Sequence, residues 1–318
     1  MIFRTSFRLC RRTFGVVDDA TTTPLDALES GFLTRDIQRL LRLERDEARA
    51  VANAAAWRTA RLESLARRRP RNGAALIAAA TPSPADLAPL LQLETSDHPY
   101  ILALPYTTDA IALIAHLVAR TKRPVLIEQT LLTQTLMPLF RGCELATPDV
   151  LIRRNRMRDE RTARAVFVTF PDHHLTLEGT TRPVTFLGGE FHFSLAEVLL
   201  YVRGAAPLVT MRAGNGRYVL DTYDAPVNAD AVREADARGL LEWLAARVES
   251  VVRAAPANVL SWRAIAQRTS AAARVRRILE GRMVQALIRM GPIHEEARSL
   301  AMDRLRVIEE SCKEGEAA

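Results

Sequence analysis

Few residues in the sequence can crosslink the chain or place it in a membrane. The three cysteines, Cys10, Cys143 and Cys312, are scattered and form no C-x-x-C pair. That spacing argues against a disulfide framework and a zinc site, and it fits a reducing compartment. No run approaches the ~18 apolar residues of a membrane span. We therefore expect a cytoplasmic protein without a metal ion or other cofactor.

Aromatic residues and lysine are also scarce, whereas arginine is abundant. Aromatic side chains make up 6% of the 318 residues, and lysine occurs only at Lys122 and Lys313. The net charge is nevertheless +7, and the isoelectric point is about 9.9. A basic surface suits an anionic partner, such as an anionic lipid or an acidic carrier protein. Arginine in an alanine-rich chain is equally typical of a GC-rich genome, so both interpretations stay open.

The first 30 residues form a basic N-terminal segment. Its start, "MIFRTSFRLCRRTFG", interleaves phenylalanine with arginine and has no acidic residue before Asp18. It lacks the apolar core of a signal peptide. The pattern predicts either peripheral contact with an anionic membrane surface, on the inner face of the cell membrane, or a frayed terminus.

Hydrophobic residues make up 48% of the chain, which is enough for a sizeable core. Residues 31–69 show helical spacing and end at "RRRPRNG". Strand and helix patterns then alternate, which predicts an α/β fold with a largely parallel central sheet flanked by helices. The expected strands are 100–105, 124–128, 165–170, 183–187, 207–213 and 216–222. The expected helices are 84–92, 108–120, 130–140, 195–203 and 230–254.

Two further patterns complete the predicted organisation. "MRAGNGRYVL" predicts a β-hairpin with Gly214-Asn215-Gly216 as its turn. Residues 266–318 are expected to form a C-terminal helical extension whose first half is densely basic. Its apolar face makes it an ordinary amphipathic helix, which suits a protein partner. We expect no nucleic-acid binding, because no recognised nucleic-acid module occurs.

An apolar strand runs directly into an apolar helix in "YILALPYTTDAIALIAHLVA", residues 100–119. The junction holds Tyr106, Thr107, Thr108 and Asp109. Junctions of this kind commonly carry catalysis or ligand binding in α/β proteins. We therefore expect the functional site at this junction.

Several segments, in this order, resemble one known family. The helical "LLRLERDEARAVANAAAWRTARLESLA", the junction above, "AVFVTFPDHHLTLEGTTRPVTFLGGEFHFSLAEVLLYVRGAAPLVTM" and "LLEWLAARVESVVRAAPANVLSW" carry the likeness. The chain resembles the bacterial late acyltransferases of lipid A synthesis, within the lysophospholipid acyltransferase superfamily. The resemblance covers residues 31–265, which we expect to form one acyltransferase-like α/β domain. It implies transfer of a fatty acyl group from acyl carrier protein or acyl-CoA to a hydroxyl or amine.

The catalytic motif of the resembled family is degenerate here. That family uses a histidine and an acid in H-x-x-x-x-D/E, in which the histidine is the general base and the acid orients it. Aligning on the following helix places Tyr106 at the histidine position and Ile111 at the acid position. Aligning on Asp109 as the acid places Leu104 at the histidine position. Neither register supplies the pair, so Tyr106, Thr107 and Thr108 are expected to bind substrate rather than catalyse.

Another histidine would then have to replace the missing base. His174 follows Phe170-Pro171-Asp172 after a predicted strand, and His192 follows Glu190 in "GGEFHFS". If the strands end on one side of the sheet, Asp172, His174, Glu190 and His192 converge with Asp109 and perform acid–base chemistry. The alternative is that they are polar loop residues with no common target.

Three further residues are predicted to bind an anionic part of the substrate. Arg182 lies in "LEGTTRPVTF", a displaced likeness of the phosphate-binding F-P-E-G-T-R motif of glycerolipid acyltransferases. Gly188 and Gly189 precede a capping box, Ser194 and Glu197, that predicts a helix start near residue 195. Glycines beside a helix N-terminus allow an anion to approach. Solvated arginine and simple helix capping are the alternatives.

Two functions therefore remain open from the sequence. The first is an acyltransferase with a remodelled active site. The second is a catalytically inactive homologue that binds a lipid or serves as a scaffold for a partner. Loss of both motif residues favours the second, and the nearby histidines and acids favour the first.

Overall fold

The computed structural model describes residues 24–265 of the chain with internal gaps. The gaps are residues 94, 96, 130, 147–149, 151–163, 173–180, 195–196, 199, 202–205, 215–216, 224–233 and 263–264. The start of the N-terminal segment and the expected C-terminal extension lie outside the described residues. The same holds for His174, which falls in the gap that follows Asp172.

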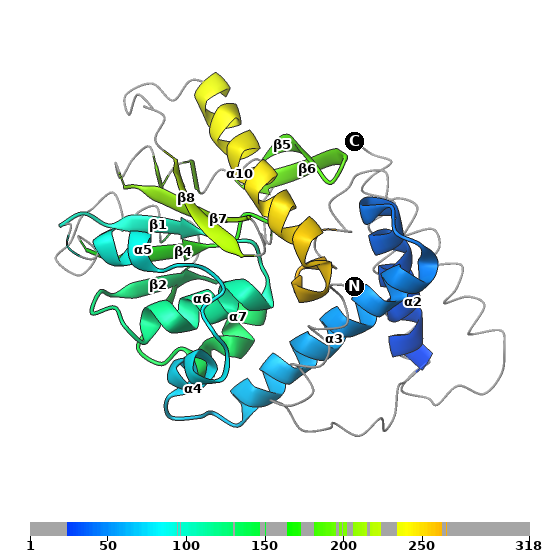
Figure 1. Ribbon diagram of the computed structural model, residues 1–318, viewed down its shortest axis with the longest axis horizontal. Helices are drawn as coiled ribbons and strands as arrows, with labels where there is room; N and C mark the ends of the chain where they lie inside the picture. Colours follow the sequence, from blue (N-terminus) through cyan, green and yellow to red (C-terminus); the bar gives the residue numbers. More distant parts are fainter. Residues whose placement is uncertain are drawn as a thin grey trace.

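A six-stranded sheet forms the centre of the molecule, with strand order β3-β2-β4-β1-β7-β8 (Figure 1). All neighbouring strands run parallel except β7 and β8, which form the expected hairpin. The strands are β1 (Tyr100–Ala103), β2 (Val125–Glu128), β3 (Glu144–Ala146), β4 (Val166–Thr169), β7 (Leu208–Ala213) and β8 (Tyr218–Tyr223). The mixed α/β architecture with a mainly parallel central sheet is thus confirmed.

The sheet separates two apolar cores, because successive strand side chains point to opposite faces. In β1, Tyr100 and Leu102 enter one core, while Ile101 and Ala103 enter the other. The first face is covered by α4 (Gly73–Ala80), α5 (Ala88–Leu93), α6 (Thr108–Val118), α7 (Leu131–Leu136) and the 3-10 turn η1 (Met137–Leu139). The second face is covered by α10 (Glu234–Ala254), α2 (Pro24–Leu41) and a separate two-stranded hairpin of β5 (Thr181–Phe186) and β6 (Gly189–Ser194).

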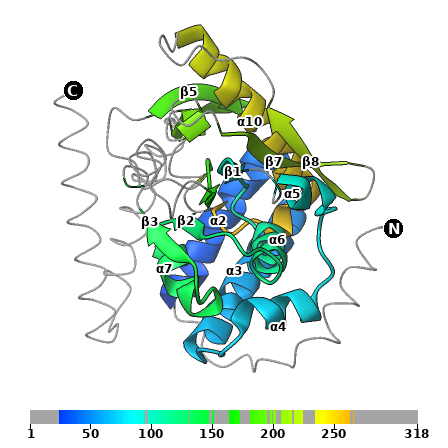
Figure 2. The same cartoon turned by 90° about the vertical axis from the view of Figure 1, so that its left-hand side faces the viewer.

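The long helix α3 (Arg45–Arg67) links the two cores. Its first half packs Val51 and Ala55 into the core shared with α10, and Ala66 at its end enters the core shared with α6. Along the way it lies beside the 3-10 turn η2 (Pro256–Asn258). Figure 1 shows α3 crossing below the sheet, and Figure 2 shows α4 at its end.

The structure differs from the predicted elements in one divided helical region, one unpredicted helix and one unpredicted short strand. The expected helical region 31–69 is two helices, because Arg42 adopts a positive φ of 55° between them. Helix α4 was not predicted, since "GAALIAAA" contains no polar residue that would create a periodic pattern. Strand β3 was missed as well, because three residues are too few for an alternation to show.

Among the helices in the described part of the chain, none combines the length and the apolar character needed to cross a bilayer.

Candidate functional site

The carboxyl edge of the parallel strands is where the topology places a site. After β1 the chain crosses to β2, whereas after β4 it continues through the β5–β6 hairpin to β7 on the other side of β1. Ligands in open α/β sheets bind where the connections diverge in this way. The loop 104–107 after β1 and the residues after β4 meet at this point, since β1 and β4 pair directly in parallel.

The loop between β1 and α6 is tied down from two sides. The backbone N–H of Tyr106 donates to Asp172 Oδ1 at 2.9 Å and to Oδ2 at 3.1 Å. The hydroxyl of Ser261 donates to the same carboxylate at 2.8 Å, and Asp172 is fully buried. On the other side, the N–H of Leu260 donates to the Tyr106 carbonyl at 2.9 Å. We call this set Tyr106, Asp172, Leu260 and Ser261 the edge latch.

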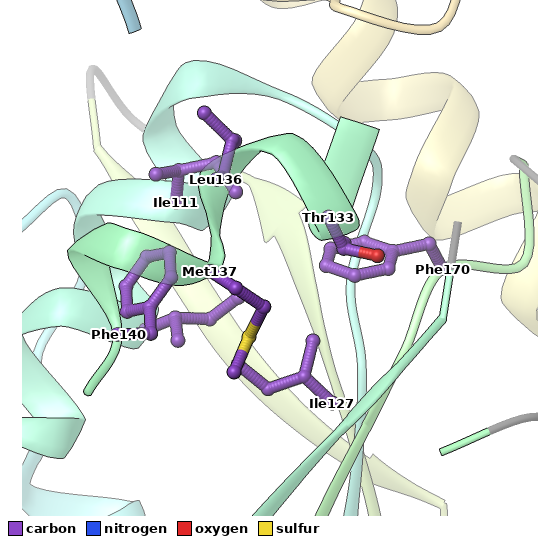
Figure 3. Close-up of a pocket in the computed structure, with 8 residues that line it drawn as sticks. Ile111, Ile127, Thr133, Leu136, Met137, Phe140 and Phe170 are labelled. Atoms are coloured by element: carbon purple, nitrogen blue, oxygen red, sulfur yellow. The ribbon is translucent and has the colours of Figure 1, made fainter. Parts of the chain in front are cut away.

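The side chain of Tyr106 points into the core rather than toward solvent. It is completely buried, and its ring meets Phe170 edge-on with 4.6 Å between ring centroids. Ile111, at the other motif position, is 2% exposed. It lines a small apolar pocket together with Phe170 and side chains from β2 and α7 (Figure 3). This pocket has room for about one water molecule, far below the roughly 300 Å³ of a ligand site.

The two threonines of the loop have different positions. Thr107 is fully buried and caps α6, because its Oγ1 accepts from the Ala110 N–H at 3.1 Å. Thr108 is the first residue of α6 and is partly exposed. The hydroxyl of Thr107 is therefore engaged in starting the helix, and the expected substrate-binding role of both threonines stays a prediction.

Asp109 belongs to a second cluster beside the edge latch. Its Oδ2 accepts from the Tyr218 hydroxyl at 2.9 Å and from the side-chain amide of Asn258. The carbonyl of the preceding residue, Ala257, accepts from the guanidinium of Arg58 on α3. Burial, together with the neighbouring Asp109, raises the pKa of Tyr218 well above its usual range. We call Arg58, Asp109, Tyr218 and Asn258 the corner cluster, and it joins α3, α6, β8 and η2.

A second buried acid at the same edge is also bound to backbone. Glu128, at the end of β2, is 1% exposed, and its Oε2 accepts from the Phe170 N–H at 2.8 Å. The carboxylates of Glu128 and Asp172 thus each fix the backbone of an adjacent strand end. Both acids are therefore placed to stabilise the edge.

His192 and Glu190 lie on the β5–β6 hairpin, which forms a sheet of its own. Their side chains are 45% and 64% exposed, and His192 Nε2 lies 3.7 Å from Glu190 Oε1. Arg182, on the partner strand β5, is also exposed. The hairpin packs on α10, and the N–H of Leu187 donates to Glu249 of that helix at 2.7 Å. The structure brings together His192 and Glu190, and it brings Asp172 to the loop of Tyr106.

Gly188 and Gly189 do not lie directly before a helix, because a strand follows them and the first described helical residues after it are 197 and 198. The two central residues of the turn between β5 and β6 are Leu187 and Gly188, with φ values of 53° and 77°, and Gly189 is the first residue of β6. Positive φ at both central residues is what a two-residue hairpin turn requires. "GEFHFS" is therefore the strand β6, with Phe191 and Phe193 buried and Glu190 exposed. The expected position of the glycines beside a helix N-terminus is wrong, because the six residues of β6 begin at Gly189.

Sequence reasoning missed Ser261, Asn258, Tyr218 and Glu128. Each contacts residues far along the chain: Ser261 is 89 positions from Asp172, and Asn258 is 149 positions from Asp109. One signal was present for Glu128, since an acid directly ending a buried apolar strand of "VLIE" needs a buried partner. For the other three the sequence offered no signal.

Within the described ranges, no three His, Cys, Asp or Glu side chains are grouped closely enough to hold a metal ion. A comparison of the chain with models of known protein families and a comparison with curated proteins each gave no match.

Proposed function

We propose that this chain is a catalytically inactive acyltransferase-like protein that acts as a lipid-binding or scaffold subunit. The observation that carries the proposal is the complete burial of Tyr106, which stands where the resembled family has its catalytic histidine. A buried phenol that packs on Phe170 does not meet an acceptor hydroxyl. A phenol is also a poorer general base at neutral pH than the imidazole of a histidine.

The surroundings of Tyr106 support the same proposal. Ile111, in the acid position, faces an apolar pocket that would make an ionised carboxylate costly. The carboxylate of Asp172 accepts hydrogen bonds from the Tyr106 N–H and the Ser261 hydroxyl, so its oxygens hold the loop in position. Asp109 is bound to Tyr218 and Asn258. The acids nearest the junction are thus used to hold the backbone and neighbouring side chains in place.

A second candidate is an active acyltransferase with a remodelled site. It is favoured by the exposed pair of His192 and Glu190 and by the position of His174 two residues after Asp172. In this account a histidine removes the proton of an acceptor hydroxyl or amine, which attacks the acyl carbonyl carbon of the donor thioester. The carbon–sulfur bond then breaks, and the thiolate of the carrier takes up the proton.

The partners of the proposed subunit follow from its charge. A net charge of +7 suits the acidic surface of an acyl carrier protein or the phosphates of acyl-CoA. A protein partner at the C-terminal extension and peripheral membrane contact of residues 2–14 are further proposals, on residues outside the described ranges. Liposome flotation of the full chain and of a variant lacking residues 2–14 tests the latter, and equal flotation counts against it.

An acyl-transfer assay on the purified full chain separates the two candidates. Acyl carrier protein and CoA with labelled acyl groups are supplied with hydroxyl and amine acceptors, and bound lipid is extracted for mass spectrometry. We expect no transfer above the protein-free blank, together with a co-purifying acyl lipid or partner protein. Transfer that falls about 10²–10⁴-fold in His174→Ala or His192→Ala establishes the second candidate instead. Transfer that survives both changes and disappears in Tyr106→Phe contradicts both accounts.

A further inference from the structure

The outer face of helix α4 is apolar although it meets solvent. Its residues, "GAALIAAA", include no polar side chain. Gly73, Ala74 and Ile77 are buried, whereas Ala75, Leu76, Ala79 and Ala80 are exposed. Leu76 is 52% exposed, the largest value among the exposed large hydrophobic side chains of the described residues. An amphipathic surface helix normally turns polar residues outward, so this face lacks the pattern of a water-facing helix.

The orientation of α4 is fixed by close packing. A Cβ atom on Gly73 would lie 2.6 Å from the Cα of Leu139, so the helix lies directly against the η1 turn. At its other end, the Thr81 carbonyl is 2.8 Å from His116 Nε2 on α6. Helix α4 therefore cannot rotate to bury Leu76 without breaking these contacts. Both ribbon views place α4 at the lower end of the molecule (Figures 1 and 2).

Exposed arginines flank α4 at both ends. Before the helix, Arg68, Arg69 and Arg71 are exposed. Arg141 joins them, since its guanidinium donates to the Arg69 carbonyl at 3.4 Å. Beyond the other end, the exposed Arg120 binds Nδ1 of His116, the residue that meets Thr81.

This part of the chain also lacks acidic residues. No aspartate or glutamate occurs between Glu63 and Asp86, a stretch that contains the whole of α4 and the preceding arginines. Glu63 itself pairs with Arg67 at 3.3 Å. An apolar helix face that is flanked by arginines and lies in a stretch of sequence without acids matches the layers of a bilayer surface, in which anionic headgroups cover the acyl chains.

We infer that α4 and its flanking arginines form a docking surface for an anionic lipid bilayer, with Leu76 entering the acyl boundary and the arginines meeting the headgroups. The surface is distinct from residues 2–14, and it does not depend on the proposed scaffold role. We call α4 with Arg68, Arg69, Arg71, Arg120 and Arg141 the α4 surface. Binding of this kind is reversible, because one short helix buries little apolar area.

Vesicle sedimentation of the full chain tests the inference. Phosphatidylcholine vesicles are compared with vesicles that also contain phosphatidylglycerol. We expect binding to the anionic vesicles that weakens as salt is added. Each arginine near an anionic surface contributes about a fivefold factor to partitioning. The triple variant Arg68→Gln/Arg69→Gln/Arg71→Gln should therefore bind roughly 100-fold more weakly, and Leu76→Glu should also weaken binding.

A matched control removes the same net charge elsewhere. Arg45→Gln/Arg49→Gln/Arg238→Gln changes three exposed arginines outside the α4 surface. Arg45 lies about 35 Å from Arg68 along α3 at 1.5 Å per residue, several screening lengths away. The control should bind the anionic vesicles within about threefold of the unaltered chain, because screened charges that distant contribute little. Equal losses in both triples, unchanged binding of the α4 variants, or no preference for anionic vesicles would each overturn the inference.

Discussion

Two regions of this molecule carry the same kinds of ionisable residue in opposite environments. At the edge latch, Asp172 is fully buried and bound to the backbone of Tyr106 and to Ser261. On the β5–β6 hairpin, Glu190 and His192 are about half exposed, and their nearest side-chain atoms lie 3.7 Å apart. The first region has the expected position of an active site, and the second has an acid and a histidine whose side chains are exposed to solvent.

The difference shows that the position typical of an active site and the exposed ionisable side chains can lie on different parts of one fold. The carboxyl edge of a parallel sheet is a good place for catalysis because loops there are free to vary. Here the acids at that edge bind strand ends and the loop before α6 through hydrogen bonds. A group that is titratable and exposed, such as His192, lies instead on a hairpin packed on α10.

The largest expected effect is the loss of Asp172. Asp172→Ala leaves the Tyr106 N–H and the Ser261 hydroxyl buried without this acceptor. The free energy of unfolding should fall by about 3–5 kcal/mol, measured by urea denaturation. Asp97→Ala is the control, since its side chain is 89% exposed, and it should cost less than about 0.5 kcal/mol. A loss at Asp172 as small as the control's would contradict the edge latch.

A smaller effect is expected in the corner cluster. Asp109→Ala removes the acceptor of Tyr218 and Asn258 and should cost about 2 kcal/mol. A double-mutant cycle with Tyr218→Phe should give a coupling energy of about 1 kcal/mol. Additive single effects would show that the two side chains do not interact in solution.

The decrease in the free energy of unfolding at high pH should depend on Tyr218. Burial and Asp109 raise the pKa of this phenol above its ordinary value near 10. The unfolded chain therefore releases the proton first as pH rises, so the stability from this group is complete below pH 10 and is lost above it. Tyr218→Phe should lessen the decline above pH 10 by up to about 1.4 kcal/mol per pH unit. Equal slopes for both proteins in urea titrations would count against this prediction.

The smallest effect is expected on the hairpin. Glu190→Ala and His192→Ala each remove half of an exposed pair, and each should change the free energy of unfolding by less than about 0.5 kcal/mol. If both variants unfold like the unaltered chain, the buried Asp172 stabilises the fold and the exposed hairpin pair does not. A cost above about 2 kcal/mol would mean that the pair is structural too.

The sequence predicts the central sheet well because its signals are local. The apolar strands at 100–105 and 165–170 are adjacent and parallel, as β1 and β4. The site is harder to predict because its contacts are distant: Tyr106 meets Asp172 across 66 positions. The prediction that Gly188 and Gly189 lie beside a helix start is wrong because glycine occurs both in turns and before helices. The alternation of Phe191 and Phe193 indicates a strand instead.

Native-state hydrogen exchange at the amide of Tyr106 tests most directly whether the junction is a fixed structural element. This amide donates to both oxygens of the buried Asp172. We expect this amide to exchange only through global unfolding, with an opening free energy within about 1 kcal/mol of the value from denaturation. We also expect faster exchange in Asp172→Asn. Exchange through a local opening several kcal/mol easier than unfolding would show a mobile loop and contradict the account.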